Sequence, residues 1–211
     1  MRVYILVDDP NSWIIPHAYA LFENLKSSKH EVHLVFNQNK ILECDVSFFL
    51  GCTSIVSPLI LARSNSNIVV HPSSLPLGRG FSPLAWQILE GKNIITVTLF
   101  EAISDLDAGD IYFTDVIKLT GTELNDEIKE VQGRVTVSLC LKYIKSYGKF
   151  SSVKQQGLTT YYKRRTPSDS EIDPHKSLAE QFNLFRVADN KKYPVFFKYN
   201  GCDYILEIRK K

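Results

Sequence analysis

The sequence predicts an α/β fold built on a Rossmann-like, mostly parallel sheet with helices on both faces. Short β-rich apolar runs alternate with helical patterns through the first two thirds of the chain, which is the order expected of strand–helix–strand units. The strands are hydrophobic throughout rather than at alternate residues, as in sheets that are covered on both faces. With 211 residues, of which 44% are hydrophobic, the chain can bury a sizeable core.

The first strand is expected over residues 3–7, and a loop over 10–13 leads from it into a helix that ends near Ser28. Four more strands are expected after this helix, over residues 31–36, 45–50, 67–70 and 94–100. Short helices are expected between them, over residues 55–62 and 82–89. The second of these has Ser82 as its expected N-cap, because the proline that follows suits a first helical turn.

A strand over 111–119 and a long amphipathic helix over 123–147 follow. The apolar residues of this helix recur at near-helical spacing. Together with the preceding elements they complete a first domain, which we expect to cover residues 1–150.

Residues 151–211 are expected to form a small α+β extension packed on the first domain. It begins with a polar connector over 151–157 and holds a helix near 177–188. Two short strands over 193–199 and 203–208 follow. The Asn200-Gly201 pair between them is a strong hairpin signal.

Composition excludes several classes of protein. The formal net charge is only +2, so no nucleic acid or membrane surface is indicated as a partner. No apolar run is long enough to cross a bilayer, and the N-terminus is typical of a strand rather than a signal peptide, so we expect a cytoplasmic protein. The cysteines show no CxxC spacing, which predicts buried free thiols and no metal site. They are Cys44, Cys52, Cys140 and Cys202.

The most informative stretch, HPSSLPLGRGFSPLAWQILEG, begins at His71. This histidine directly follows an apolar strand, so it should lie at the carboxyl end of the sheet, where open α/β sheets bind ligands. The segment LDAGD places Asp107 in an acidic turn further along the chain. One of these residues could act as a base and the other as the carboxylate that orients it. No GxGxxG or Walker pattern is present, and Gly78-Arg79-Gly80 alone is too weak to indicate phosphate binding.

This region resembles the formyltransferases that use 10-formyltetrahydrofolate, among them methionyl-tRNA, glycinamide ribonucleotide and sugar N-formyltransferases. The matching residues are His71-Pro72-Ser73, Leu75-Pro76, Arg79-Gly80, Pro83 and the turn from Leu106 to Asp110. The tail is similar to the segment that follows the catalytic domain in the sugar enzymes. That similarity is carried by residues 165–169, by Ile172-Asp173 and by the helix with Asn183 and Arg186.

The resemblance implies that a substrate amine attacks the formyl carbon and passes through a tetrahedral oxyanion, without a metal. His71 would accept the amine proton or hydrogen-bond the oxyanion, and Asp107 would fix the imidazole tautomer and favour its charged form. The family asparagine two residues before the histidine is replaced here by Val69. Asn67 lies about 13 Å from His71 along an extended strand, too far to substitute. We hypothesise that Asn11 or a backbone N–H donates a hydrogen bond to the oxyanion instead.

The resemblance also assigns the pterin contacts of the folate largely to backbone groups. The corresponding positions are Leu50, Gly51, Ser73, Ser74, Leu75, Pro76, Ile103 and Asp105. Apolar walls suit such a pocket, although ordinary core packing explains the same residues equally well.

The acceptor is inferred from the tail. A tRNA-formylating enzyme would carry a longer, basic C-terminal domain, whereas this chain has little excess charge. We expect a nucleotide-activated amino sugar, such as a 4-amino-4,6-dideoxyhexose used in O-antigen and lipopolysaccharide biosynthesis. Guanidinium groups match phosphate oxygens, which suggests arginines for the pyrophosphate. The expected substrate contacts are Asn11, Trp13, Arg79, Arg164, Arg165, Asn183 and Arg186.

Two alternatives stay open. The acceptor could be another small amine, such as a free amino acid, a peptide or a nucleotide. The chain could also be an inactive module that binds folate or a nucleotide sugar and has lost activity with the asparagine. The C-terminal hairpin suggests a homodimer.

Overall fold

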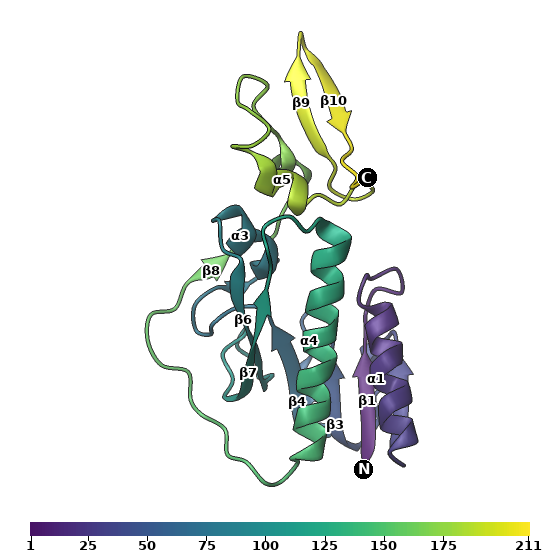
Figure 1. Ribbon diagram of the computed structural model, residues 1–211. Helices are drawn as coiled ribbons and strands as arrows, with labels where there is room; N and C mark the ends of the chain where they lie inside the picture. Colours follow the sequence, from purple (N-terminus) through teal and green to yellow (C-terminus); the bar gives the residue numbers. More distant parts are fainter.

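A six-stranded sheet with the order β2-β1-β3-β4-β6-β7 forms the centre of the computed structural model, which covers residues 1–211 (Figure 1). Its strands are β1 (Arg2–Leu6), β2 (Glu31–Val35), β3 (Cys44–Phe49), β4 (Ser64–His71), β6 (Ile94–Glu101) and β7 (Ile111–Lys118). Strands β1 to β4 pair in parallel, whereas β6 runs antiparallel to both β4 and β7. The predicted mostly parallel, Rossmann-like sheet is confirmed, with β6 as its one reversed strand.

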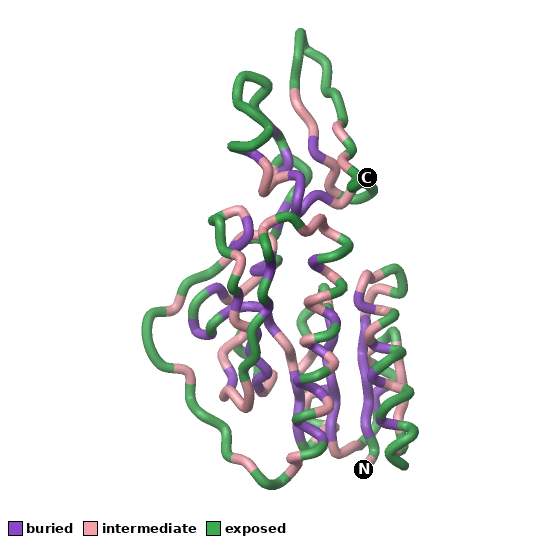
Figure 2. The backbone as a smooth tube through the Cα atoms, in the orientation of Figure 1, coloured by how far each residue is buried: buried purple, intermediate pink, exposed green.

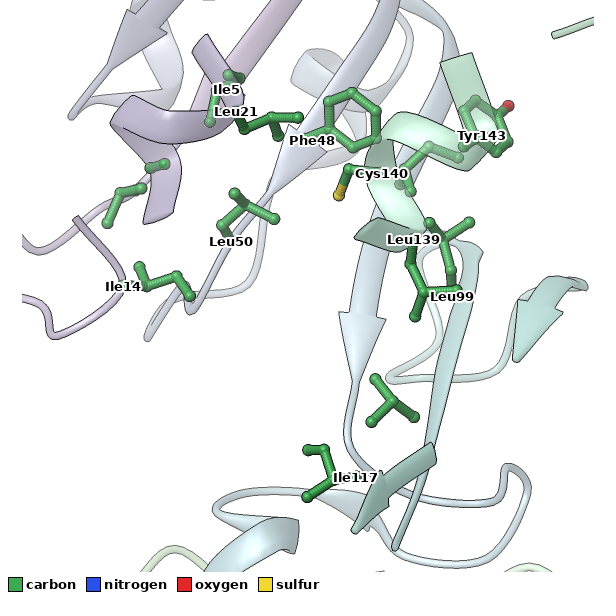
Figure 3. Packing of buried hydrophobic residues seen from close by; sticks show 14 of the residues in the cluster. Ile5, Ile14, Leu21, Phe48, Leu50, Leu99, Ile117, Leu139, Cys140 and Tyr143 are labelled. Carbon is green, nitrogen blue, oxygen red and sulfur yellow. The ribbon is translucent and has the colours of Figure 1, made fainter. Parts of the chain in front are cut away.

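Two long helices, α1 (Ile15–Ser27) and α4 (Asn125–Lys145), lie side by side over one face of the sheet (Figure 1). The side chain of Glu127 accepts the Leu124 N–H at 2.8 Å and so caps the start of α4. Buried apolar residues of the strands and of both helices form one continuous cluster on this face (Figure 3). Burial of this cluster supplies the main stabilisation of the domain.

The opposite face has a much thinner cover. Its buried cluster contains Tyr4, Leu6, Ile41, Phe49 and Ile60. The elements over it are short: the helix α2 (Pro58–Leu61), the 3-10 turn η1 (Gln38–Lys40) and loops. The helices on the two faces are therefore unequal. The strand register places Val69 opposite Phe49 and His71 opposite Thr98, so the His71 side chain emerges on the thinly covered face.

The chain between β4 and β6 forms the short strand β5 (Arg79–Gly80) and the helix α3 (Pro83–Leu89). Ser82 precedes α3 as predicted, but its side chain makes no capping bond. The reason is its backbone, which adopts a left-handed conformation with φ of 51°. After α4 the chain loops outward and returns to pair β8 (Tyr161–Tyr162) with β5 (Figure 1).

The C-terminal extension holds the 3-10 turn η2 (Pro167–Ser170), the helix α5 (Phe182–Arg186) and the strands β9 (Val195–Tyr199) and β10 (Cys202–Leu206). The helix is much shorter than the predicted 177–188. The side-chain amide of Gln181 donates to the backbone carbonyls of Asp173, Lys176 and Ser177, which holds that stretch in turns instead of a helix.

The predicted hairpin is confirmed. Asn200 and Gly201 both have positive φ, at 48° and 79°, as the tight turn that matches strand twist requires. The extension has its own small core of Ile172, Phe185, Ala188 and Val195. Much of the rest of the hairpin is exposed (Figure 2).

The cysteines differ in burial. Cys140 is buried and Cys44 and Cys52 are half-buried, but Cys202 is exposed because it begins the outer strand of the hairpin. The prediction of buried thiols is therefore confirmed for Cys140, holds only in part for Cys44 and Cys52, and is wrong for Cys202. None of the helices combines the length and hydrophobicity needed to span a bilayer.

Gly133 allows α1 and α4 to approach closely. A Cβ at this position would collide with the imidazole of His17. Alanine in a helix normally stabilises by about 1 kcal/mol relative to glycine, whereas overpacking costs about 1–3 kcal/mol. We expect Gly133→Ala to lower the free energy of unfolding by about 1 kcal/mol, measured by urea denaturation.

The matched control is the same substitution in a His17→Ala background, where the obstructing ring is gone. There Gly133→Ala should stabilise the protein. Stabilisation of the wild-type chain as well would contradict the close helix contact.

Candidate active site

A cavity of about 660 Å³ opens at the carboxyl ends of the parallel strands, which is a size typical of small-molecule sites. Leu50 at the end of β3 and His71 at the end of β4 line it. The acidic turn contributes Asp107, and the C-terminal extension contributes Arg164 and Tyr193. Residues from both parts of the chain therefore build one cavity.

His71 is the last residue of β4, and its side chain is buried. Its Nε2 lies 2.8 Å from the carbonyl oxygen of Gly78. A carbonyl can only accept, so Nε2 carries a proton and Nδ1 is the nitrogen left to face the acidic turn. Gly78 has φ of 69°, and a Cβ there would crowd Ser73 and the ring of Tyr162. Glycine is thus required for the carbonyl to reach the imidazole.

Asp107 comes to His71 from a distant segment. Its Oδ2 lies 3.8 Å from His71 Nδ1 and accepts the N–H of Gly80 at 2.8 Å. The two side chains are thus brought together within ion-pairing distance but beyond hydrogen-bonding distance. The carbonyl of Gly78, and not Asp107 as expected, makes the bond that fixes the imidazole tautomer.

The reversed direction of β6 explains how the carboxylate arrives. β6 ends at Glu101, which pairs with Ile68, three residues before the end of β4 at His71. The turn that follows β6 must therefore return along the face of the sheet to reach His71. Within this turn a Cβ on Gly109 would collide with the carbonyl oxygen of Glu101. The glycine of the DAGD sequence therefore permits the close approach of the turn to β6.

Glu101 is a second half-buried carboxyl near the site, which the sequence did not indicate. One oxygen accepts the backbone N–H of Asn67 at 2.6 Å and the other accepts the hydroxyl of Tyr112 at 2.8 Å. Burial raises the pKa of the Glu101 carboxyl, and these two hydrogen bonds offset only part of the increase. Burial and the neighbouring Glu101 also raise the pKa of Tyr112.

Asn67, Val69 and Asn11 bear on which group replaces the family asparagine as a hydrogen-bond donor. Asn67 donates its amide to the carbonyl of Leu61 at 3.0 Å, so it is turned away from His71. Val69 lines the cavity at the family position. Asn11 is exposed on the loop after β1 and also lines the cavity, as does Trp13, which packs edge-on against His17.

The residues expected to contact the folate divide into two groups. Leu50, Gly51 and Ile103 line the cavity. The others do not: they are Ser73, Ser74, Leu75, Pro76 and Asp105. The carbonyl of Ser73 accepts the hydroxyl of Thr98 at 2.6 Å, which ties this loop back onto β6.

The arginines expected to bind phosphate also differ in whether they line the cavity. Arg186 is 1% exposed and donates to Glu123 and to Asn183, so both Arg186 and Asn183 have a packing role and neither lines the cavity. Arg165 lines the cavity but is buried and donates to the Val187 carbonyl and to Ser170. Burial lowers the pKa of both guanidinium groups.

The remaining two arginines face different surroundings. Arg79 does not line the cavity, and its guanidinium donates to Gln155. Arg164 is exposed at the cavity wall, where it stacks on Phe81 at 4.3 Å and donates to the Thr53 carbonyl at 3.0 Å. It is the predicted arginine best placed to meet a soluble anion.

Three lysines that the sequence did not single out line the cavity: Lys129, Lys191 and Lys192. Lys129 of α4 pairs with Asp189 at 3.0 Å, and Lys192 pairs with Asp9 at 3.4 Å. Both pairs join the extension to the first domain. No local sequence pattern signals them, because each partner comes from a distant segment.

The fold and site together define an α/β protein with an imidazole and a carboxylate at the carboxyl edge of a Rossmann-like sheet. The chain belongs to the formyl transferase family, whose model matches residues 10–138.

Two curated relatives show the extent of the similarity. The methionyl-tRNA formyltransferase of Campylobacter hominis is 31% identical over 162 residues, which are 74% of this chain and 50% of that protein. The methionyl-tRNA formyltransferase of Mycoplasma capricolum is 26% identical over 79% of this chain and 54% of that protein. The chain thus spans about half the length of the curated relatives it matches.

Solved structures share the fold. A methionyl-tRNA formyltransferase from Clostridium thermocellum has a TM-score of 0.84 at 23% identity, over 100% of this chain and 93% of that one. A 4-N formyltransferase from Francisella tularensis has a TM-score of 0.75 at 18% identity, over 100% and 98%. HypX from Aquifex aeolicus, solved with tetrahydrofolic acid, has a TM-score of 0.78 at 18% identity, over 99% and 37%.

The raised pKa of Glu101 predicts a pH dependence of stability. The folded state holds this proton more tightly than the unfolded chain, whose glutamate pKa is about 4.3. Stability from this group is therefore complete below that value and is lost as pH rises through the folded pKa. We expect Glu101→Gln to remove this loss, measured as unfolding free energy between pH 4 and pH 8. Parallel curves for the two proteins would contradict it.

Proposed function

We propose that this protein transfers a formyl group from 10-formyltetrahydrofolate to the amine of a nucleotide-activated amino sugar. The observation that carries the proposal is the His71–Asp107 pair, 3.8 Å apart at the wall of a cavity of about 660 Å³. Membership of the formyl transferase family supports the reaction class.

The cavity fits the folate donor, which is a co-substrate that supplies the formyl group. Its volume lies within the range of small-molecule sites. Leu50 and Ile103 give it apolar walls, against which a pterin ring can pack. The structural relative HypX was solved with tetrahydrofolic acid.

The residues of this chain have separable tasks in such a transfer. The attacking amine must lose a proton, and negative charge develops on the formyl oxygen. His71 Nδ1, the ring nitrogen not engaged by Gly78, can hold a proton for that oxygen or take one from the amine. Asp107 stabilises the positive charge that the ring then carries, and the N–H of Gly80 keeps the carboxylate in place.

A further donor is needed where Val69 replaces the family asparagine. We propose Asn11 or a backbone N–H of the cavity wall for this task. Asn11 makes its hydrogen bond through its backbone N–H, to Asp9 at 2.9 Å, which leaves its side-chain amide available to a ligand.

The cationic wall supports an acceptor that carries phosphate. Arg164 and Lys191 line the cavity without a carboxylate partner, whereas the two other lysines at the wall are paired with aspartates. A 4-amino-4,6-dideoxyhexose on a nucleoside diphosphate combines such phosphates with a reactive amine, and its product would enter a surface glycan. The fold is shared with the 4-N formyltransferase from Francisella tularensis.

Methionyl-tRNA is the second candidate acceptor. The 31% identity to the methionyl-tRNA formyltransferase of Campylobacter hominis favours it. The low net charge of +2 is unusual for a protein that binds RNA and favours the sugar acceptor instead.

A coupled assay tests the reaction and the acceptor together. The protein is mixed with 10-formyltetrahydrofolate and a panel of amino-sugar nucleotides, methionyl-tRNA and free amino acids, and formylated product is detected by mass. We expect product from a sugar nucleotide. His71→Gln and Asp107→Asn should each lower kcat by about 10²–10⁴-fold while the folate still binds.

The other outcomes separate the rivals. Product from methionyl-tRNA alone would overturn the sugar assignment. Binding of folate and sugar nucleotide without turnover would identify an inactive binding module.

Removal of the Arg164 guanidinium tests the phosphate contact. We expect Arg164→Ala to raise the KM for the sugar nucleotide by about tenfold, since a charge-assisted hydrogen bond contributes about 1.5–3 kcal/mol. The kcat should change little, because in the proposed role the guanidinium contacts the phosphates and not the amine or the formyl group. Arg209→Ala, an exposed arginine paired with Glu207 outside the cavity, is the control. Equal effects of the two substitutions would contradict a specific contact.

A further inference from the structure

Gln155, in the polar connector after α4, bonds simultaneously to both loops that carry the active-site pair. Its side-chain nitrogen donates to the carbonyls of Asp107 and Gly109, each at 2.8 Å. Its side-chain oxygen accepts from Arg79 Nε at 3.2 Å and from Arg79 Nη2 at 2.6 Å. One amide thus makes four hydrogen bonds and has no capacity left for others.

These bonds fix the backbone of the acidic turn, which sets the direction of the Asp107 carboxylate. Asp107 has φ of 51°, a left-handed conformation that costs free energy in a residue other than glycine. The carbonyl of the same residue is held by Gln155, and its carboxylate is held by the N–H of Gly80. The turn therefore keeps this conformation because it is anchored on both sides.

The Arg79 contact links the same amide to the other loop. Arg79 immediately precedes Gly80, whose N–H binds the carboxylate, and follows Gly78, whose carbonyl binds His71. The backbone of this loop is also fixed by bonds to Thr160 and Tyr162. Besides Asp107 itself, Gln155 is a second side chain that connects this fixed loop to the acidic turn.

We propose that Gln155 is a positioning residue that sets the separation between His71 and Asp107. This inference rests on the proposed formyl transfer. Gln155 does not line the cavity, so it acts through Asp107 and not on substrate. Rates of preorganised sites are sensitive to such placement, since a displacement of about 1 Å can cost about 100-fold.

Two substitutions separate the bonds that Gln155 makes. Gln155→Glu keeps the length and the acceptor for Arg79 but has no N–H for the two carbonyls. Gln155→Met keeps the approximate length without charge and loses all four bonds. Gln156→Glu and Gln156→Met are the matched controls, because this neighbour is exposed and makes no side-chain hydrogen bond.

We expect both Gln155 variants to lower kcat by about 10- to 100-fold, with less than threefold changes in KM for either substrate. The Gln156 variants should match the wild type. Melting temperatures identify any loss of folding, and if Gln155→Glu does not fold, Gln155→Met decides. A kcat within twofold of wild type in the folded variants would overturn the proposal.

Combination with Asp107→Asn distinguishes positioning from general damage. If Gln155 acts through the carboxylate, adding Gln155→Glu to Asp107→Asn should lower kcat less than threefold further, because the two residues share one task. A full additional 10- to 100-fold loss would indicate a structural effect unrelated to Asp107, and the proposal would fail.

A readout independent of turnover covers the case in which the formyl transfer itself is wrong. The imidazole nitrogen resonances of His71, assigned by their absence in His71→Gln, report the surroundings of Nδ1 by NMR. We expect them to shift in Gln155→Met and not in Gln156→Met. An inactive wild type with this shift would refute the proposed function alone, whereas unshifted resonances would refute the positioning role.

Discussion

The active-site geometry depends on three consecutive residues, Gly78-Arg79-Gly80. The carbonyl of Gly78 holds the His71 imidazole, and the N–H of Gly80 holds the Asp107 carboxylate. Both glycines have positive φ, and a Cβ on either would meet Tyr162. This segment therefore needs glycine for close packing against β8, and its backbone holds the two side chains in place.

The uneven cover of the sheet explains where the site can form. Long helices seal one face, and the other has only short elements over a small cluster. Because β6 runs against its neighbours, the turn after it returns along the thinly covered face and meets the end of β4. The C-terminal extension then closes the cavity with side chains that the sheet cannot supply.

Features that depend on local sequence were predictable. The strand end at His71, the acidic turn at Asp107 and the Asn200-Gly201 hairpin all follow from short patterns and a family resemblance. Features that depend on distant partners were not. Arg186 suited a phosphate by residue type, yet it is buried against Glu123, and the polar connector gave no sign that Gln155 would contact two remote loops. The length of the helix predicted near 177–188 was overestimated, because the sequence pattern did not show that the Gln181 side chain would bond to the preceding backbone carbonyls.

The bond from His71 Nε2 to the Gly78 carbonyl has a consequence for how the imidazole would work in the proposed formyl transfer. This nitrogen keeps its proton and donates a hydrogen bond whether the ring is neutral or cationic, so the bond survives a change of charge. Only the Nδ1 proton is then free to come and go. The ring can exchange it without rotating, and the surrounding loop does not have to rearrange at each turnover.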